Sequence, residues 1–178
     1  IFQNLKNHSR DGAGIRFETG NLKVTRSLFR NSYQGILTAH DPKATMIVEQ
    51  STFTGLGRCD PDHNCAHSIY GGHIYSIEVR NCRFERGTSG HYVKFGGKVA
   101  TITSNAFDDS NGSRTNYMID LPNGAIGEIS NNIFVQGPNK ENPSALITVT
   151  AEEKKNSSTG LTIVNNEASL APGAPQNP

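Results

Sequence analysis

The stretch LKVTRSLF, residues Leu22–Phe29, sets the pattern that repeats along the whole chain. Apolar residues alternate with polar ones, a Ser follows, and a Phe ends the unit two positions later. Self-similarity of this kind is the signature of a repeat architecture. Further copies lie at Met46–Phe53, Ile77–Phe84, Val99–Phe107, Ile126–Phe134 and Leu161–Ala168, the last without its Phe, while Phe2 ends a copy that lacks its start.

A second short apolar group follows each unit, as at Gly35–Thr38 and Tyr92–Phe95. These groups are rich in β-forming residues and too short for helices. Gly, Asn, Asp and Pro fill the gaps between them, as turns require. The pattern therefore predicts two kinds of strand in every repeat, and no stretch has helical periodicity.

A single coil of this kind cannot bury its own apolar face, but stacked coils can. We expect each Phe to lie on the Phe of the next coil, with a rise of ~4.8 Å per coil. The position two before each Phe has the same inward parity, which predicts a buried polar ladder at a bend. The ladder would contain Ser27, Ser51, Cys82, Asn105, Asn132 and Asn166.

The predicted fold is thus an all-β parallel β-helix of about six to seven coils over residues 1–170, followed by an extended tail at 171–178. The 178 residues carry 17 Lys and Arg against 16 Asp and Glu, a net charge of +1, which disfavours a strongly basic nucleic-acid binder. No apolar run is long enough to span a membrane. Because the chain starts at Ile1 rather than Met, we expect a processed piece, truncated at its N-terminus, of a longer precursor.

The repeats resemble the right-handed parallel β-helix proteins of the pectin-lyase-like superfamily, over roughly residues 1–170. Four segments are similar to a bacterial β-helix subgroup of unassigned activity: HSIYGGH at 67–73, GHYVK at 90–94, YMIDLPNG at 117–124 and GPNKENPS at 137–144. The superfamily includes polysaccharide lyases, hydrolases, epimerases, adhesins and phage tailspikes. The resemblance implies a secreted, periplasmic or cell-surface protein with a polysaccharide partner, although one fold hosts many chemistries.

Two of the three cysteines, Cys59 and Cys65, flank the segment DPDHN. A loop-closing disulfide in an exported protein is the preferred interpretation. Free thiols and a zinc site of two thiolates and a His are the alternatives, but five residues separate the cysteines and there is no second pair. Cys82 falls on the ladder and reads as a small buried residue. No cofactor is expected; calcium is an alternative at HDP, 40–42, and DPD, 60–62.

Aligned second strands predict an outward column with one residue per coil: Arg16, Leu37, Tyr70, Lys94, Asp120 and Thr148. Neighbours in this column would be roughly 5 Å apart. His67, His91 and Tyr117 lie two positions before the inward column. Parity places them on the inner face, unless a bend turns them outward.

This cluster predicts a site for an acidic polysaccharide. Lyases and epimerases need a base and a positive group beside the substrate carboxylate. We expect Lys94 to neutralise the carboxylate of a uronate substrate. His91 or His67 would act as the base, and Tyr70 or Tyr117 would donate the proton. Asp120, His73 and Arg16 are assigned to substrate binding. Hydrolysis would need paired carboxylates, which Asp108, Asp109 and Asp120 could supply.

Two alternatives stay open. The outward column can be an ordinary solvated face in which Lys94 and Asp120 form a cross-strand charge pair. The protein can also be a non-catalytic structural, adhesive or filament-forming module, because Ile1 and Phe2 begin in mid-coil and β-solenoid ends need a cap. Under that hypothesis copies stack end to end, or the chain continues a longer parent. Whether the protein is an enzyme is left open.

Overall fold

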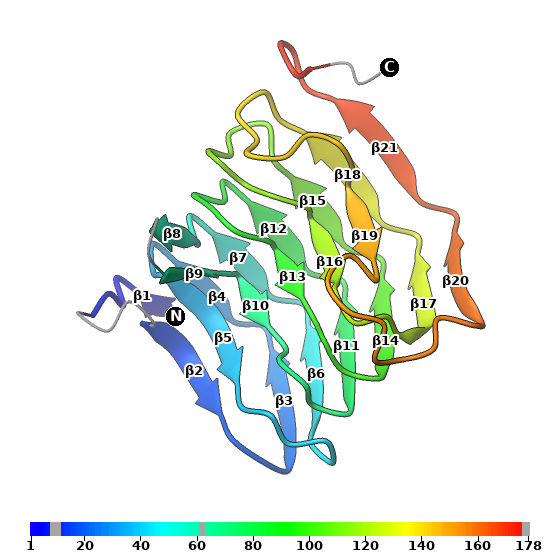
Figure 1. The fold of residues 1–178 in the computed structure, drawn as a ribbon. Helices are drawn as coiled ribbons and strands as arrows, with labels where there is room; N and C mark the ends of the chain where they lie inside the picture. The colour runs from blue at the N-terminus through cyan, green and yellow to red at the C-terminus, as the bar shows by residue number, and fades with distance from the viewer. Residues whose placement is uncertain (8–11, 61–62, 176–178) are drawn as a thin grey trace.

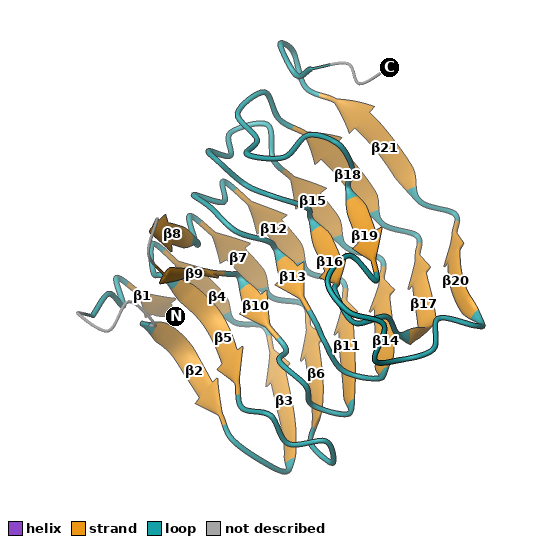
Figure 2. Cartoon of the chain, viewed as in Figure 1, coloured by secondary structure: helices purple, strands orange, loops and turns teal. Residues whose placement is uncertain are grey.

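The computed structural model describes residues 1–7, 12–60 and 63–175, and these form a parallel β-solenoid (Figure 1). Strands and loops make up this part of the chain, and Figure 2 shows no helix in it. The winding amounts to about five turns, slightly fewer than the six to seven coils expected. The expectation counted the incomplete terminal copies as coils. No helix among the described residues is long and apolar enough to cross a membrane.

Three parallel sheets run along the solenoid, and each repeat adds one strand to each sheet. Sheet A holds β1 (Phe2–Gln3), β4 (Leu28–Arg30), β7 (Thr52–Thr54), β12 (Arg83–Glu85), β15 (Ala106–Asp108), β18 (Ile133–Gln136) and β21 (Glu167–Leu170). Sheet B holds β2 (Ala13–Phe17), β5 (Gln34–Thr38), β10 (Ile69–Tyr70), β13 (Val93–Lys94), β16 (Ile119–Leu121) and β19 (Ile147–Val149). Sheet C holds β3 (Asn21–Thr25), β6 (Thr45–Glu49), β11 (Ser76–Arg80), β14 (Val99–Thr103), β17 (Ile126–Ser130) and β20 (Leu161–Val164).

A small antiparallel hairpin projects from the loop between sheets A and B (Figure 1). It consists of β8 (Arg58–Asp60) and β9 (His63–Ala66). Arg58 and Cys59 of this hairpin form one wall of a cleft.

The Phe residues stack along the interior as the repeat predicts. Phe29 lies 4.7 Å from Phe53 between ring centroids, with the rings within 4° of parallel. The stack continues through Phe84, Phe107 and Phe134 at spacings of 4.8–5.0 Å. Each of these rings is at most 1% exposed, so the column is the spine of the apolar core. Offset aromatic contacts at such distances add to the hydrophobic gain.

The polar ladder is also confirmed. Oδ1 of Asn132 accepts from both the backbone N–H and the side-chain amide of Asn105, at 2.9 and 3.0 Å. Asn166 repeats the pattern one coil further, at 3.0 and 2.9 Å to Asn132. Cys82 takes the same position, with its N–H bonded to Oδ1 of Asn105. Buried amides are thus satisfied by one another, as burial demands.

The bends from sheet C to sheet A all have the same backbone form. One residue in each has a φ between 47° and 58°, in the left-handed region, and the ladder residue follows it. These residues are Arg26, Gln50, Asn81, Ser104, Asn131 and Asn165. The connections from sheet A to sheet B, in contrast, differ in length.

Candidate functional site

The predicted outward column is present on sheet B. Tyr70 pairs in register with Lys94, and Lys94 with Asp120. Asp120 is followed by Thr148, and Arg16 and Leu37 precede Tyr70. The strands therefore bring together side chains that lie far apart in the sequence.

The three residues His67, His91 and Tyr117 stack on one another across successive coils. The His67 and His91 rings are 5.0 Å apart, and His91 and Tyr117 are 5.8 Å apart. His67 also stacks on the outward-facing Tyr70 at 5.6 Å. The bend before each strand thus turns these rings toward the outward column, the second of the two placements expected. We call His67, Tyr70, His91, Lys94, Tyr117 and Asp120 the sheet-B cluster.

Hydrogen bonds fix the tautomers of both histidines. Nδ1 of His67 accepts from the backbone N–H of His91 at 3.0 Å, so the ring proton of neutral His67 is on Nε2. Nδ1 of His91 donates to the carbonyl of Tyr117 at 3.1 Å. This leaves Nε2 of His91 facing Oδ2 of Asp120 at 3.5 Å. His91 can therefore exchange a proton only on the side where Asp120 lies.

Burial controls the charge of the histidines. His67 is 5% exposed, and desolvation holds its pKa well below the usual range. Burial also lowers the pKa of His91, although the charge of Asp120 opposes this shift. Both imidazoles are therefore neutral at pH 7, as a base requires. His67, however, is enclosed and bonded to the backbone, so it positions His91 rather than meeting a ligand.

Asp120 is the centre of the cluster. Its side chain is 3% exposed, and its Oδ1 accepts from the Thr148 hydroxyl at 2.8 Å. Oδ2 lies 3.3 Å from Nζ of Lys94. Burial alone would lower the pKa of Lys94, but the hydrogen bond that Lys94 donates to Glu152 and the charge of Asp120 outweigh burial and raise the pKa. Lys94 is a permanent cation above a buried carboxylate.

A cavity of about 140 Å³ opens beside Lys94. Tyr70, His73, Glu152 and Lys155 also line it. Burial, with the nearby charges of His40 and Lys155, lowers the pKa of His73, so its imidazole is neutral. The charges around the cavity balance, because Lys94 is paired with Glu152 and Lys155 with Glu153.

The structure therefore divides the predicted site residues. Tyr70, Lys94 and His73 line the cavity, whereas His91 and Asp120 lie behind Lys94. Arg16 belongs to the same column two coils away, where it pairs with Glu18 at 2.5 Å. Whether these residues bind or transform a sugar stays a prediction.

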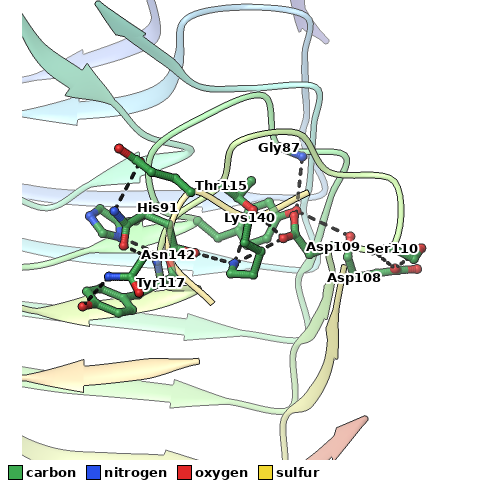
Figure 3. A network of polar contacts seen from close by, with 12 residues as sticks. Gly87, His91, Asp108, Asp109, Ser110, Thr115, Tyr117, Lys140 and Asn142 are labelled. Carbon is green, nitrogen blue, oxygen red and sulfur yellow. Dashed lines mark hydrogen bonds and ion pairs between the residues drawn. The ribbon is translucent and has the colours of Figure 1, made fainter. Parts of the chain in front are cut away.

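A second buried polar network ties three of the loops between sheets A and B (Figure 3). Asp109, which is 1% exposed, accepts from the Tyr92 hydroxyl at 2.7 Å and lies 3.2 Å from Nζ of Lys140. The Thr115 hydroxyl also donates to Asp109, and the carbonyl of Asn116 accepts from Lys140. Asp109 is fully engaged by these partners, so it is not placed to act as a catalytic carboxylate.

Cys59 and Cys65 form a disulfide that closes the β8–β9 hairpin, with their Cα atoms 4.2 Å apart. The predicted loop-closing disulfide is confirmed, and both the free thiols and the thiolate zinc site are wrong. Cys82 is free, and burial raises its pKa to about 11. Asp62, part of the calcium alternative, lies outside the described residues. Among residues 1–7, 12–60 and 63–175 no group of His, Cys, Asp and Glu is placed to hold a metal.

The structure also has a large hollow that was not predicted from the sequence. It is a cleft of about 880 Å³, formed by the connections that follow β1, β4, β7, β12 and β15. Stacking of these connections makes it roughly 19 Å long along the solenoid. Among the residues that the structure describes, five cationic side chains line it: Lys6, Arg30, Arg58, Arg86 and Arg114. We call this hollow the basic cleft.

Most of the positive charge in the basic cleft is uncompensated. The carboxylate of Glu85 is held by Arg83 at 2.5 Å, and Arg58 is held by Asp60 at 2.7 Å. In the part of the chain that the structure describes, Lys6, Arg86 and Arg114 form no ion pair, and Arg30 bonds only to the neutral amide of Gln3. The guanidinium of Arg58 also lies 4.7 Å over the ring of Tyr33, which fixes the hairpin wall of the cleft.

No protein-family model, curated protein or solved structure matches this chain. What the chain shares with the β-helix proteins is therefore the parallel solenoid itself.

Proposed function

We propose that this β-solenoid binds an acidic polysaccharide in the basic cleft. The observation that carries the proposal is the row of four cations, Lys6, Arg30, Arg86 and Arg114, that have no acidic partner among the described residues. Cations gathered in a concave site attract a polyanion more strongly than the same charges spread over a surface. Arg is the side chain best suited to carboxylate and sulfate groups, because its planar fork bonds both oxygens.

Several features favour a polysaccharide over a nucleic acid. The net charge is only +1, which disfavours a strongly basic nucleic-acid binder. Among the described residues that line the cleft, Tyr33 alone has an aromatic ring, and Arg58 lies over that ring. The disulfide favours an exported protein, in contact with envelope or external glycans. The resemblance to the pectin-lyase-like superfamily supports the same partner.

The experiment compares binding of polygalacturonate with binding of neutral dextran by titration calorimetry at several salt concentrations. Arg86 and Arg114 both have left-handed backbones, with φ of 54° and 56°, and so does Arg26, outside the cleft, with φ of 47°. Asn tolerates this conformation. Arg86→Asn with Arg114→Asn is therefore the test, and Arg26→Asn is the matched control.

We expect the double variant to bind polygalacturonate about three- to tenfold more weakly at low salt, as the loss of two exposed charge contacts implies. The difference should shrink as salt is added. The control variant should bind like the parent. Equal losses in both variants, or tighter binding of a duplex DNA than of any acidic glycan, would contradict the proposal.

A second candidate function is acid–base chemistry on a uronate in the cavity beside Lys94. The specific observation is that Tyr70, His73 and Lys94 line one cavity, with the Asp120 carboxylate 3.3 Å behind Lys94. In a β-elimination, Lys94 would hold the carboxylate and a neutral imidazole would take the C5 proton. The C4–O bond would then break, and a Tyr hydroxyl would protonate the departing oxygen.

Incubation with uronate polymers tests this chemistry, since each cleavage leaves an unsaturated end that absorbs in the ultraviolet. Activity that falls by at least a hundredfold in Lys94→Met would support it, in keeping with the size of electrostatic effects in active sites. An unchanged spectrum with every polymer would exclude the lyase. The structural or filament-forming alternative predicts assembly that increases with concentration, which light scattering measures.

A further inference from the structure

The connection between β19 and β20 folds back over earlier coils and covers the cavity beside Lys94. The backbone N–H groups of Glu152 and Glu153 both donate to the carbonyl of Pro122, at 3.1 Å each. The N–H of Asn156 donates to the carbonyl of Asn123 at 2.9 Å. We call residues 151–156 the strap.

Asn156 anchors the far end of the strap. Its side-chain amide donates to the carbonyls of Gly97 and Gly124, both at 2.9 Å. These glycines belong to turns of two earlier coils, so one side chain fastens the strap across them. The backbone of the strap is therefore held to the earlier coils, whereas the side chains of residues 151–155 are exposed.

Glu152 is such a side chain. Its side chain is 56% exposed, and its Oε1 lies 2.5 Å from Nζ of Lys94, whose side chain is only 17% exposed. Asp120 contacts the same Nζ from the buried side at 3.3 Å. Lys94 is thus paired with a buried carboxylate on one side and with an exposed carboxylate on the other.

We infer that Lys94 is the carboxylate-binding group of a subsite for one acidic sugar, and that Glu152 occupies this subsite as an internal competitor. The inference rests on the second candidate function and is independent of the basic cleft. An exposed ion pair contributes little to stability, so an external carboxylate can take the place of Glu152 without disturbing the fold. The replacement is one carboxylate for another, and it leaves the pairing of Lys94 with Asp120 intact.

The size and lining of the cavity specify the occupant. A volume of about 140 Å³ admits a single sugar ring and not a folded chain. The Tyr70 ring offers an apolar face with a polar edge, which suits the mixed surface of a sugar. Because Glu153 is paired with Lys155 and not with Lys94, it does not compete for the subsite.

The experiment measures binding of trigalacturonate, with maltotriose as the uncharged probe. The parent protein carries Arg86→Asn and Arg114→Asn, which weakens binding in the basic cleft. Glu152→Gln is the test and Glu153→Gln is the matched control on the same strap. Lys94→Met combined with Asp120→Asn removes the subsite without leaving a buried carboxylate unpaired. Amide chemical shifts of Gly96, Gly97 and Asn156 report on this location.

Glu152→Gln should bind trigalacturonate about two- to fivefold more tightly than the parent, the size of an exposed ion pair. Glu153→Gln should leave the affinity unchanged, and the gain should vanish with Lys94→Met and Asp120→Asn. The inference is overturned if Glu152→Gln binds no better, if the gain survives loss of Lys94, or if maltotriose binds equally well. Failure of the basic cleft would appear separately, in the polygalacturonate titration of the unmodified protein.

Discussion

Nδ1 of His67 accepts the backbone N–H of His91 across 3.0 Å, so two histidines on neighbouring coils share one hydrogen bond. The bond requires an unprotonated Nδ1 on His67. Burial also lowers the pKa of His67, which favours the same unprotonated form. The junction between these two coils therefore depends on a neutral imidazole.

The protein should lose stability on mild acidification. Because the folded pKa of His67 lies below the unfolded value of about 6.5, the unfolded chain takes up the proton first, and folding is weakened as pH falls below 6.5. The free energy of unfolding should fall by up to about 1.4 kcal/mol per pH unit in that window. His67→Asn keeps an acceptor for the His91 N–H and should have a shallower dependence in urea titrations from pH 7.5 to 5.5. Parallel curves for the two proteins would contradict this prediction.

Asn132→Ala should be strongly destabilising. Asn132 is 0% exposed, and its Oδ1 accepts two hydrogen bonds from Asn105 while its amide bonds the Ile102 carbonyl at 2.8 Å. Unsatisfied buried groups left by the change should cost about 2–4 kcal/mol. Urea denaturation measures the loss, with the exposed Asn111→Ala as control. A loss no larger than that of the control would show that water replaces the amide.

Lys140→Met should cost about 3–5 kcal/mol, because it leaves the buried carboxylate of Asp109 without its cation. Lys140 has a side chain that is 0% exposed, and Asp109 is 1% exposed. Adding Asp109→Asn removes the stranded charge and should recover most of the loss. If the double variant is no more stable than Lys140→Met, the charge is not the cause, and calorimetric melting curves distinguish these results.

Replacing both Cys59 and Cys65 by Ser should weaken binding in the basic cleft. The disulfide closes a loop with a sequence separation of 6. Its removal should lower the stability of the hairpin by about 2 kcal/mol. Arg58 and Cys59 line the cleft, so a looser hairpin holds Arg58 less well. Polygalacturonate affinity should fall in the variant and in the reduced protein alike. An unchanged affinity in both would show that the hairpin wall makes no contribution.

The repeat determined the fold because parity and period act locally. Alternation along residues 22–29 is enough to point Val24 and Phe29 inward, and stacking then follows from the need to bury them. The column of Tyr70, Lys94 and Asp120 was predictable for the same reason. The number of turns was overestimated, since a repeat at either end is counted whether or not it completes a coil.

The chemistry of the site was less predictable because it depends on segments between the strands. Parity could not decide the side taken by His67 and His91, which is set by a bend. Glu152 reaches Lys94 from 58 residues away through a strap without repeat character. The basic cleft brings Arg30, at the end of β4, together with Arg86 and Arg114 from connections of unequal length. The signal in the sequence that could have indicated the cleft is an Arg soon after the Phe of a repeat. Arg30 directly follows Phe29, and Arg86 lies two positions after Phe84.

The uniform bends from sheet C to sheet A have a consequence for how such a chain can change. Each of these bends has the same length and a left-handed residue before the ladder, so an inserted residue there would break the amide contacts on both sides. The connections from sheet A to sheet B carry no such constraint and already differ from coil to coil. Sequence variation that alters specificity can therefore accumulate on that one edge, and loops exchanged there would retarget the protein while its scaffold stays the same.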